Sequence, residues 1–355
     1  MPTQLSPTDF LAAPGLILDV RSPAEHQQGH IPEACCFPLF TNEERTKVGI
    51  CYKYQGKEAA VELGLAIVGP KLADFVHQAK TLSRDRQVRI HCWRGGMRSN
   101  SMAWLLETAG FQVTVLQGGY KAFRRWLRET LGTQQRVLTL GGMTGTGKTT
   151  VLQALAIQGE QIIDLEAIAN HRGSSYGAFG LPSQPSTEQF ENVLAMAWDK
   201  LKPQQPVWIE AESRMVGTCR IPDEIFSQMQ VAPVFQIERS RTERIAILLE
   251  IYGQIDRAEL ITATERISRR LGGLATQKAV THIQNGDPAA AIAIVLDYYD
   301  KTYQYDLKRR QVPTITVPIT GLTATQAATQ LIAIAAKVIS DSVDRKFSRK
   351  GVGSG

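Results

Sequence analysis

The chain has 355 residues, of which 43% are hydrophobic and 21% charged, so a folded protein of about two domains is expected. No stretch approaches the roughly 18 consecutive apolar residues of a membrane span, and residues 1–10 lack the features of a signal peptide, so a cytoplasmic location without membrane contact is expected. The net charge of +6 and the isoelectric point of about 9.0 favour a polyanionic partner without identifying one.

The first part of the chain alternates short apolar runs with helical patterns. The runs predict strands at 16–20, 87–91 and 112–116, and a helix is predicted over 99–108. Strands that alternate with helices indicate a parallel sheet covered on both faces. A short polar connector at 132–135 ends this part, so a first α/β domain is expected over residues 1–132.

A cysteine loop follows the second predicted strand directly and precedes a helix. The backbone N–H groups of the turn, the helix N-terminus and the charge of Arg98 all favour the thiolate form of Cys92. Such a cradle would hold a tetrahedral oxyanion or an anionic persulfide, so Cys92 and Arg98 are the candidate catalytic residues. The loop that would bind the anion consists of Cys92, Trp93, Arg94, Gly95, Gly96, Met97 and Arg98.

A basic stripe is expected where the first domain ends. Lys121, Arg124, Arg125 and Arg128 follow the spacing of one helix face, and apolar side chains including Trp126 form another face. The stripe is either a solvated helix face or a surface that contacts phosphates.

A second α/β domain is expected over residues 133–345. Strands are predicted at 136–140, 161–165, 206–210 and 231–237, and the proline of the last segment indicates an edge strand or a bend. The region from Arg239 to about Tyr305 is mainly helical in pattern. The basic, Gly/Ser-rich residues 346–355 are expected to form a disordered tail.

A P-loop motif, G-x4-G-K-[ST], lies between the strand at 136–140 and a helix that begins near Lys148. Its backbone amides cradle phosphates, its lysine supplies a charge, and Thr149 can bind Mg²⁺. The expected diphosphate-binding residues are Gly142, Thr144, Gly145, Thr146, Gly147, Lys148 and Thr149.

No clean Walker-B aspartate accompanies this motif, which does not favour efficient ATP hydrolysis. Asp164 and Glu210 each end a predicted strand and are the candidates for Mg²⁺ binding or acid–base chemistry; no metal site is certain, and no tightly bound cofactor is expected. Arginine-rich segments at 239–244 and 266–270, the latter with Arg269 and Arg270, are solvated helix faces, a diphosphate clamp or contacts to nucleic-acid phosphates.

About residues 5–130 resemble the rhodanese family. The opening motif is Asp19-Val20-Arg21-Ser22-Pro23, Glu25-His26 and Gly29-His30-Ile31-Pro32, and the closing motif is Leu116-Gln117-Gly118-Gly119. The resemblance implies that the loop cysteine carries sulfur as a persulfide and that Asp19, Arg21 and His30 hold the fold. The Cys-x5-Arg spacing is one residue longer than in common sulfur-transferring rhodaneses and equals that of cysteine phosphatases. We therefore hypothesise a loop that accommodates selenophosphate or selenium.

The order of a rhodanese-like and a P-loop domain resembles bacterial tRNA 2-selenouridine synthases. Further similar stretches are Val48-Gly49, Tyr52-Lys53, Gln55-Gly56-Lys57, Leu63-Gly64-Leu65, Glu210-Ala211-Glu212-Ser213-Arg214 and Ile221-Pro222. The resemblance implies that wobble 2-thiouridine in tRNA is S-geranylated with geranyl diphosphate and then converted to 2-selenouridine with selenophosphate. Trp93 and Trp126 are candidates for base stacking. A cysteine phosphatase or a rhodanese-type sulfurtransferase fused to a nucleotide-binding domain remains an alternative.

Overall fold

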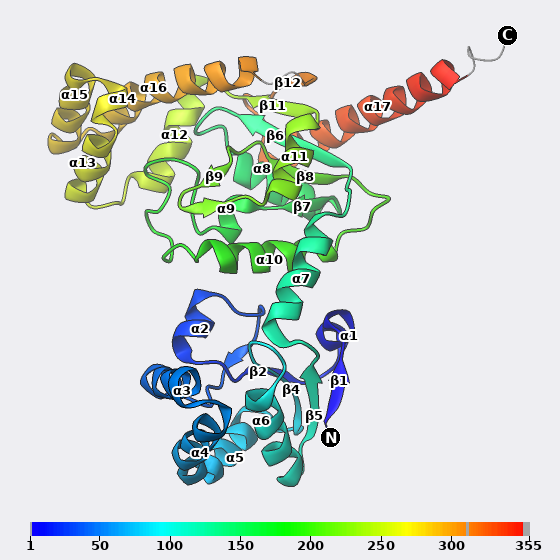
Figure 1. Cartoon of the computed structure of the whole chain (residues 1–355). Coiled ribbons are helices and arrows are strands. Elements are labelled where there is room, and N and C mark those ends of the chain that lie inside the picture. The colour runs from blue at the N-terminus through cyan, green and yellow to red at the C-terminus, as the bar shows by residue number, and fades with distance from the viewer. Residues whose placement is uncertain (1, 310–311, 351–355) are drawn as a thin grey trace. The chain divides into compact units, whose positions relative to one another are not determined.

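The chain forms two compact units in a computed structural model that describes residues 2–309 and 312–350 (Figure 1). The first unit holds the residues up to 132 together with 186–199, and the second holds 133–185 and the residues from 200 onward. Helix α10 (Thr187–Asp199) therefore belongs to the first unit, although the segments on both sides of it belong to the second.

The first unit is built on a parallel five-stranded sheet in the order β1-β5-β4-β2-β3. The strands are β1 (Thr3–Leu5), β2 (Leu16–Asp19), β3 (Cys35–Cys36), β4 (Gln87–His91) and β5 (Gln112–Leu116). The three predicted strands are thus confirmed as the inner strands β2, β4 and β5. The edge strands β1 and β3 have three and two residues, too few to show a pattern in sequence.

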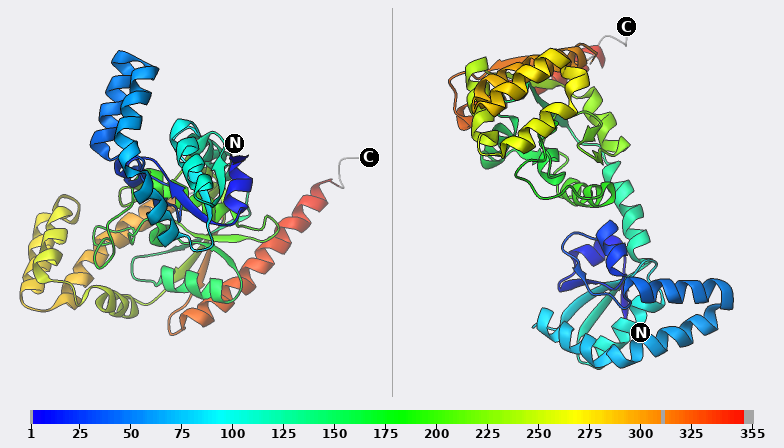
Figure 2. Two further views of the ribbon diagram at one scale, coloured as in Figure 1. Left: turned by 90° about the horizontal axis from the view of Figure 1, so that it is seen from below. Right: turned by 90° about the vertical axis from the view of Figure 1, so that its left-hand side faces the viewer.

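Helices cover this sheet, and α3 and α4 pack against each other as a helical hairpin (Figure 2). The helices are α1 (Pro7–Ala12), α2 (Pro23–Gln28), α3 (Asn42–Gln55), α4 (Lys57–Val68), the 3₁₀ turn η1 (Gly69–Lys71), α5 (Leu72–Leu82), α6 (Met97–Thr108) and α7 (Gly119–Leu131). The helix predicted over 99–108 is α6, which begins two residues earlier.

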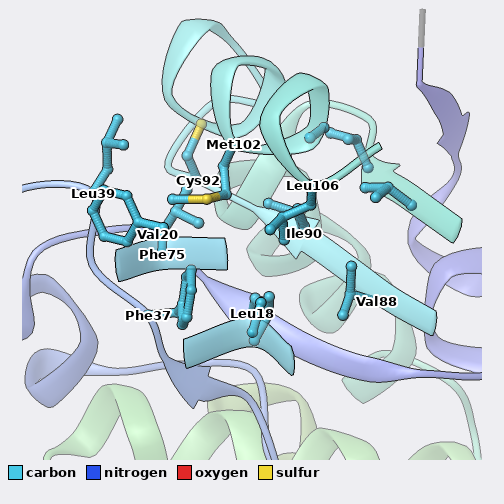
Figure 3. Close-up of a cluster of buried hydrophobic side chains, with 14 of the residues drawn as sticks. Leu18, Val20, Phe37, Leu39, Phe75, Val88, Ile90, Cys92, Met102 and Leu106 are labelled. Carbon is cyan, nitrogen blue, oxygen red and sulfur yellow. The ribbon is translucent and has the colours of Figure 1, made fainter. Parts of the chain in front are cut away.

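The core of the first unit lies between the sheet and its helices (Figure 3). Leu18 of β2, Ile90 of β4 and Leu106 of α6 are fully buried, and Phe75 of α5 and Met102 of α6 pack in the same cluster. Each side chain of this size stabilises the folded state by roughly 1.5–3 kcal/mol when fully buried. This core fixes the end of β4, where the cysteine loop begins.

The second unit has a parallel sheet in the order β12-β11-β6-β8-β7, together with a small antiparallel hairpin. The sheet strands are β6 (Val137–Gly142), β7 (Gln161–Ile163), β8 (Val207–Glu210), β11 (Val234–Glu238) and β12 (Thr314–Pro318), and the hairpin strands are β9 (Met215–Val216) and β10 (Cys219–Arg220).

The expectation of an edge strand at 231–237 is wrong. Strand β11 lies between β6 and β12, and Pro233 precedes its first residue, so the proline removes no hydrogen bond from the ladder. The Pro233 carbonyl accepts hydrogen bonds from the N–H and the hydroxyl of Thr139, each 3.0 Å long.

The C-terminal part is helical, as expected. The helices of the second unit are α8 (Lys148–Ile157), α9 (Leu165–Ile168), α11 (Asp223–Val231), α12 (Arg241–Tyr252), α13 (Arg257–Arg266), α14 (Ser268–Leu271), α15 (Gly273–Gln284), α16 (Pro288–Arg309) and α17 (Ala324–Lys350). Helix α17 packs on α8 and runs to Lys350, so residues 346–350 of the expected tail are helical, whereas 351–355 lie outside the described residues. In the described part of the chain, no helix is long and apolar enough to cross a membrane.

The two predicted loops occupy equivalent places in the two sheets. The cysteine loop follows β4, the middle strand of the first sheet, and the P-loop follows β6, the middle strand of the second. Parallel α/β sheets bind their ligands at the carboxyl ends of such strands. Each unit therefore presents one candidate site at its expected edge.

Candidate functional site

The cysteine loop is fixed by the closing motif at 116–119. Gly95 has a φ of +64°, and a Cβ there would lie 2.8 Å from the carbonyl oxygen of Leu116. Gly119 has a φ of +60°, and a Cβ on it would overlap the Cys92 carbonyl. The N–H of Tyr120 donates to that carbonyl over 2.8 Å. Only glycine satisfies both the backbone conformation and the close approach at these two positions.

Cys92 is almost fully buried, with 3% of its surface exposed, and its side chain lies near Val20 and Met102 (Figure 3). Its Sγ is 3.3 Å from the hydroxyl of Ser99, which also lies 3.0 Å from the carbonyl of Gly96. The single hydroxyl hydrogen can go to the carbonyl while Cys92 is a thiol, or to the sulfur once it is a thiolate. Ser99 is therefore a ready donor to an anionic sulfur or selenium.

Arg98 is paired with Glu25 of α2. Its Nη1 lies 2.7 Å from Oε2, and the backbone N–H of Ser22 donates to the same carboxylate over 3.0 Å. Burial raises the pKa of Glu25, but the hydrogen bonds and charge of Arg98 outweigh it, so the pKa lies below its ordinary value. The arginine charge expected beside Cys92 is thus balanced by a carboxylate that was not predicted as its partner. In the sequence, Glu25 stood out as part of the opening motif and of a capping box with Ser22.

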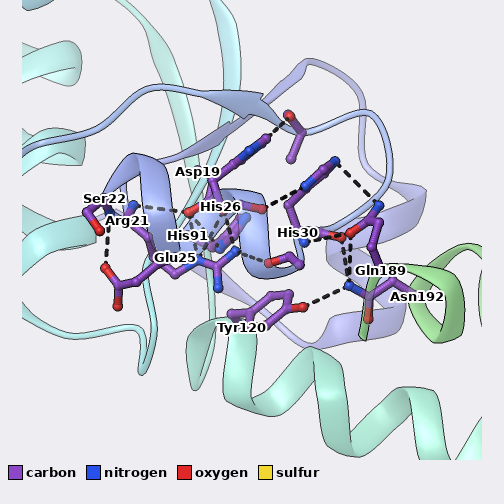
Figure 4. A network of polar contacts seen from close by, with 12 residues as sticks. Asp19, Arg21, Ser22, Glu25, His26, His30, His91, Tyr120, Gln189 and Asn192 are labelled. Atoms are coloured by element: carbon purple, nitrogen blue, oxygen red, sulfur yellow. Dashed lines mark hydrogen bonds and ion pairs between the residues drawn. The ribbon is translucent and has the colours of Figure 1, made fainter. Parts of the chain in front are cut away.

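Asp19 and Arg21 form a buried pair inside the first unit (Figure 4). Both side chains are fully buried, and Arg21 Nη2 donates to Asp19 Oδ2 and to the carbonyl of Gly29, each over 2.6 Å. The guanidinium group also lies 3.8 Å from the ring centre of Tyr120. These contacts tie β2 to α7 and to the loop after α2, which agrees with the expected structural role.

His30 is held by α10 rather than left open (Figure 4). The side-chain amide of Asn192 donates to the carbonyl of His30 over 2.9 Å and to the hydroxyl of Tyr120 over 2.7 Å. Arg124 donates to Asn192 over 2.6 Å and forms an ion pair with Glu191. One member of the predicted basic stripe is therefore committed to α10.

The other three cations of the stripe, Lys121, Arg125 and Arg128, are exposed on α7. Trp126 is partly buried and lies over Phe123 with ring centres 5.7 Å apart, so it packs within the unit. Trp93 is 37% exposed at the cysteine loop and remains the better placed aromatic for a base.

The P-loop has the backbone that phosphate binding requires. Gly145 and Gly147 take φ values of +81° and +82°, and Lys148 follows at the start of α8. Lys148 Nζ donates to the carbonyl of Gly142 over 3.0 Å, which places its charge over the loop. The loop lies at the N-terminus of a helix, where N–H groups and the helix dipole favour an anion.

Two arginines of the segment 239–244 donate hydrogen bonds to backbone carbonyls of the P-loop. Arg239 Nε donates to the carbonyl of Thr146 over 3.2 Å, and Arg244 Nε donates to that of Thr144 over 2.8 Å. Arg244 is 4% exposed and is paired with Asp300 of α16. By contrast, the predicted phosphate contacts Arg269 and Arg270 are exposed on α14, and their side chains make no hydrogen bond or ion pair to another residue in the described part of the chain.

Glu166, rather than the candidates Asp164 and Glu210, lies next to the P-loop hydroxyl. Thr149 Oγ1 donates to Glu166 Oε2 over 3.1 Å. Asp164 instead caps α9 through the N–H of Ala167, and the fully buried Glu210 accepts the N–H of Leu165.

Burial raises the pKa of Glu166 to about 7 despite the nearby Lys148, and burial raises that of Glu210 well above its ordinary value. Residues 2–309 and 312–350 contain no cluster of three or more His, Cys, Asp or Glu that could hold a metal. Mg²⁺ commonly takes one or two protein oxygens together with phosphate oxygens, and Thr149 with Glu166 could supply the protein share.

The fold and the two loops define a two-domain α/β protein, with a cysteine loop in a rhodanese-like unit and a P-loop in a second unit. The rhodanese-like domain model matches residues 8–125, and the model described as tRNA 2-selenouridine synthase AAA domain matches residues 135–321. A tRNA 2-selenouridine synthase of Marinobacter nauticus is 35% identical over 83% of this chain and 89% of its own length. One from Shewanella oneidensis is 34% identical over 85% and 89%. The chain belongs to the tRNA 2-selenouridine synthase family.

Proposed function

We propose that this chain is a transferase that converts 2-thiouridine at the tRNA wobble position to 2-selenouridine. In this proposal geranyl diphosphate and selenophosphate are co-substrates, and S-geranyl-2-thiouridine is the intermediate. One observation carries the proposal: a cysteine loop and a P-loop each follow the middle strand of a separate parallel sheet in one chain of this family. Two such sites suit two successive displacements with different leaving groups.

The first displacement is assigned to the P-loop. The sulfur of 2-thiouridine attacks C1 of geranyl diphosphate, the C1–O bond breaks, and the N3 proton passes to solvent. The leaving diphosphate gains negative charge as the bond breaks. The loop amides and Lys148 stabilise that charge, and Arg239 and Arg244 hold the loop carbonyls in place. Neither displacement requires ATP hydrolysis, which fits the absence of a clean Walker B.

The second displacement is assigned to the cysteine loop. The S-geranyl group makes C2 of the base electrophilic, selenium attacks that carbon, and the C2–S bond breaks with release of geranylthiol. Water cleaves the P–Se bond and releases phosphate, so no oxidant or reductant is needed. The loop amides would hold the oxyanion of selenophosphate, and the side chains of Cys92 and Ser99 would contact its selenium atom.

The tRNA would be held by exposed cations rather than by the buried ones. Lys121, Arg125 and Arg128 lie together on α7, and Arg269 and Arg270 lie on α14. Exposed lysines and arginines bind nucleic-acid phosphates with a strong dependence on salt. The binding of thiolated tRNA should therefore weaken steeply as the salt concentration rises.

The cysteine variant tests the second assignment. Cys92→Ser should abolish selenation, by a factor of about 100 or more, and leave geranylation of thiolated tRNA largely intact, because the P-loop unit is unchanged. Cys36→Ser, at an exposed cysteine of the same unit, is the matched control. Equal loss of both half-reactions in the folded variant would contradict the division of steps.

The lysine variant tests the first assignment. Lys148→Ala should weaken the use of geranyl diphosphate by about 10-fold or more, measured as kcat/KM for geranylation, because the diphosphate loses its charge partner. Conversion of an already geranylated tRNA with selenophosphate should be preserved. Lys202→Ala, at an exposed lysine of the same unit, serves as control. If geranylation survived Lys148→Ala unchanged, the role assigned to the P-loop would be wrong.

The spacing Cys-x5-Arg also favours a cysteine phosphatase as a second candidate. A phosphatase needs a general acid for its leaving group, and the carboxylate nearest Arg98, Glu25, is engaged in an ion pair. Release of the phenol from an aryl phosphate by the wild-type chain, but not by Cys92→Ser, would favour this alternative.

A further inference from the structure

An apolar pocket adjoins the P-loop within the second unit. It is a cavity of about 50 Å³ that is partly open to solvent, and it lies between helices α12, α13, α15 and α16. Its walls include Leu248, Leu260, Ile283 and Val295, and Thr144 of the P-loop forms one side. The role proposed above for the P-loop concerns only the diphosphate head group and leaves this pocket without a function.

The phosphate cradle and the pocket share a wall. Leu248 lines the pocket, and a Cβ on Gly145 of the P-loop would lie 3.0 Å from its side chain. Arg244 fixes the carbonyl of Thr144, which also lines the pocket. The pocket therefore adjoins the loop on which a diphosphate would rest.

Three hydroxyls of the pocket wall already have hydrogen-bond partners within the protein. The hydroxyls of Tyr176 and Thr264 lie 2.8 Å apart, and Thr264 also donates to the carbonyl of Leu260 over 2.7 Å. The hydroxyl of Tyr299 accepts the N–H of Ser175 over 3.1 Å. A nucleobase placed here would lose hydrogen bonds to water without replacing them, which is costly, whereas a hydrocarbon loses none.

We propose that this pocket binds the hydrocarbon chain of a prenyl diphosphate and that Ala291 of α16 sets the length of hydrocarbon chain that it accepts. Ala291 is 4% exposed and lines the pocket. The inference rests on the proposed function, in which geranyl diphosphate is the alkyl donor. The inference adds where the hydrocarbon of the donor binds and why the site selects a prenyl group rather than a nucleoside.

The test compares binding of the diphosphate head group with binding of the hydrocarbon chain, on the intact 355-residue polypeptide. Calorimetric titration should show geranyl S-thiolodiphosphate binding at least about tenfold tighter than inorganic pyrophosphate, since each buried methylene favours binding by about fourfold. Ala291→Phe fills the pocket and should remove about tenfold or more of this advantage while pyrophosphate binding stays unchanged. Ala258→Phe, at an exposed position of the pocket helix α13, is the matched control and should bind both as the wild type does.

A second variant separates a filled pocket from a damaged helix. Val295→Ala enlarges the pocket and should shift preference toward the longer farnesyl analogue, which a merely destabilised α16 would not do. If Ala291→Phe and Val295→Ala both kept the wild-type preference, the pocket assignment would be overturned while geranyl donation stood. If the wild type bound the geranyl analogue no tighter than pyrophosphate, the pocket assignment and the use of geranyl diphosphate as donor would both be contradicted. Altered analogue binding together with no geranylation of tRNA would support the pocket and overturn the proposed function alone.

Discussion

A buried histidine, His91, immediately precedes Cys92 in the sequence. His91 is fully buried between the rings of Phe10 and Tyr120, and its Nδ1 lies 3.7 Å from Asp19 Oδ1. Desolvation lowers the pKa of His91 to about 4, although the nearby carboxylate acts in the opposite direction. The side chain is therefore neutral near pH 7 and acts there as a packing residue.

This histidine predicts how the stability of the chain depends on pH. The pKa of His91 falls from 6.5 in the unfolded chain to about 4 in the folded one. Between these values the unfolded chain binds a proton that the folded chain does not, so the free energy of unfolding falls as pH falls through that window. The contribution lost between pH 7 and pH 4.5 is about 2 kcal/mol.

Urea unfolding of the wild type and of His91→Gln at several pH values measures this contribution. The difference in free energy of unfolding should shrink by about 2 kcal/mol from pH 7 to pH 4.5, because glutamine does not titrate. Ionisable groups distant from His91 cancel in the difference, and Asp19 is the neighbouring carboxylate that does not. Parallel curves for the two proteins would contradict the burial assigned to His91.

Residue motifs revealed the two loops from the sequence but not the partners of their side chains. Cys92 and Lys148 stand in short motifs whose chemistry is local. The pairing of Arg98 with Glu25, 73 residues away in sequence, depends on how α2 packs against α6. Likewise the choice of Glu166 rather than Asp164 beside Thr149 depends on where α9 begins, because Asp164 is used as its cap.

At the scale of elements, α10 is joined to the first unit by a polar network centred on Asn192. This side chain is fully buried and bonds to His30, Tyr120 and Arg124. Loss of such an amide leaves a carbonyl and a hydroxyl without these partners. The helix is therefore held by specific hydrogen bonds as well as by its apolar face.

Asn192→Leu should destabilise the docking of α10 by about 2–3 kcal/mol, because buried polar groups lose their partners. Amide hydrogen exchange should rise in residues 187–199 more than in β4 or β6. Asp199→Leu, at the exposed end of the same helix, should leave the exchange unchanged. Exchange rates equal to the wild type in Asn192→Leu would show that the network does not hold the helix.

The inner strands could be predicted because each is a run of apolar residues ended by a motif. The short strands β1 and β3 and the late strand β12 could not, because their pairing is set by neighbours distant in sequence. The proline before β11 was misjudged for a local reason: it precedes the strand and leaves the ladder intact. The amphipathic pattern of α10 indicates a buried face but does not say which unit covers it.

At the scale of the whole molecule, the order of a rhodanese-like and a P-loop unit was evident from the sequence and is confirmed by both family matches. The sequence did not reveal that α10 belongs to the first unit, because residues 186–199 lie between two segments of the second unit. The chain therefore crosses between the units three times, after 132, after 185 and after 199. Cutting the chain at residue 132 would separate α10 from the unit on which it packs, so both half-reactions are best assayed on the intact chain.

The most direct test of the central claim is mass spectrometry of nucleosides from thiolated tRNA incubated with the wild-type chain, geranyl diphosphate and selenophosphate over time. The account predicts that S-geranyl-2-thiouridine rises first and falls as 2-selenouridine appears, and that geranyl diphosphate alone stops the reaction at the first product. A folded protein that leaves 2-thiouridine unchanged, or that forms 2-selenouridine without geranyl diphosphate, would contradict it.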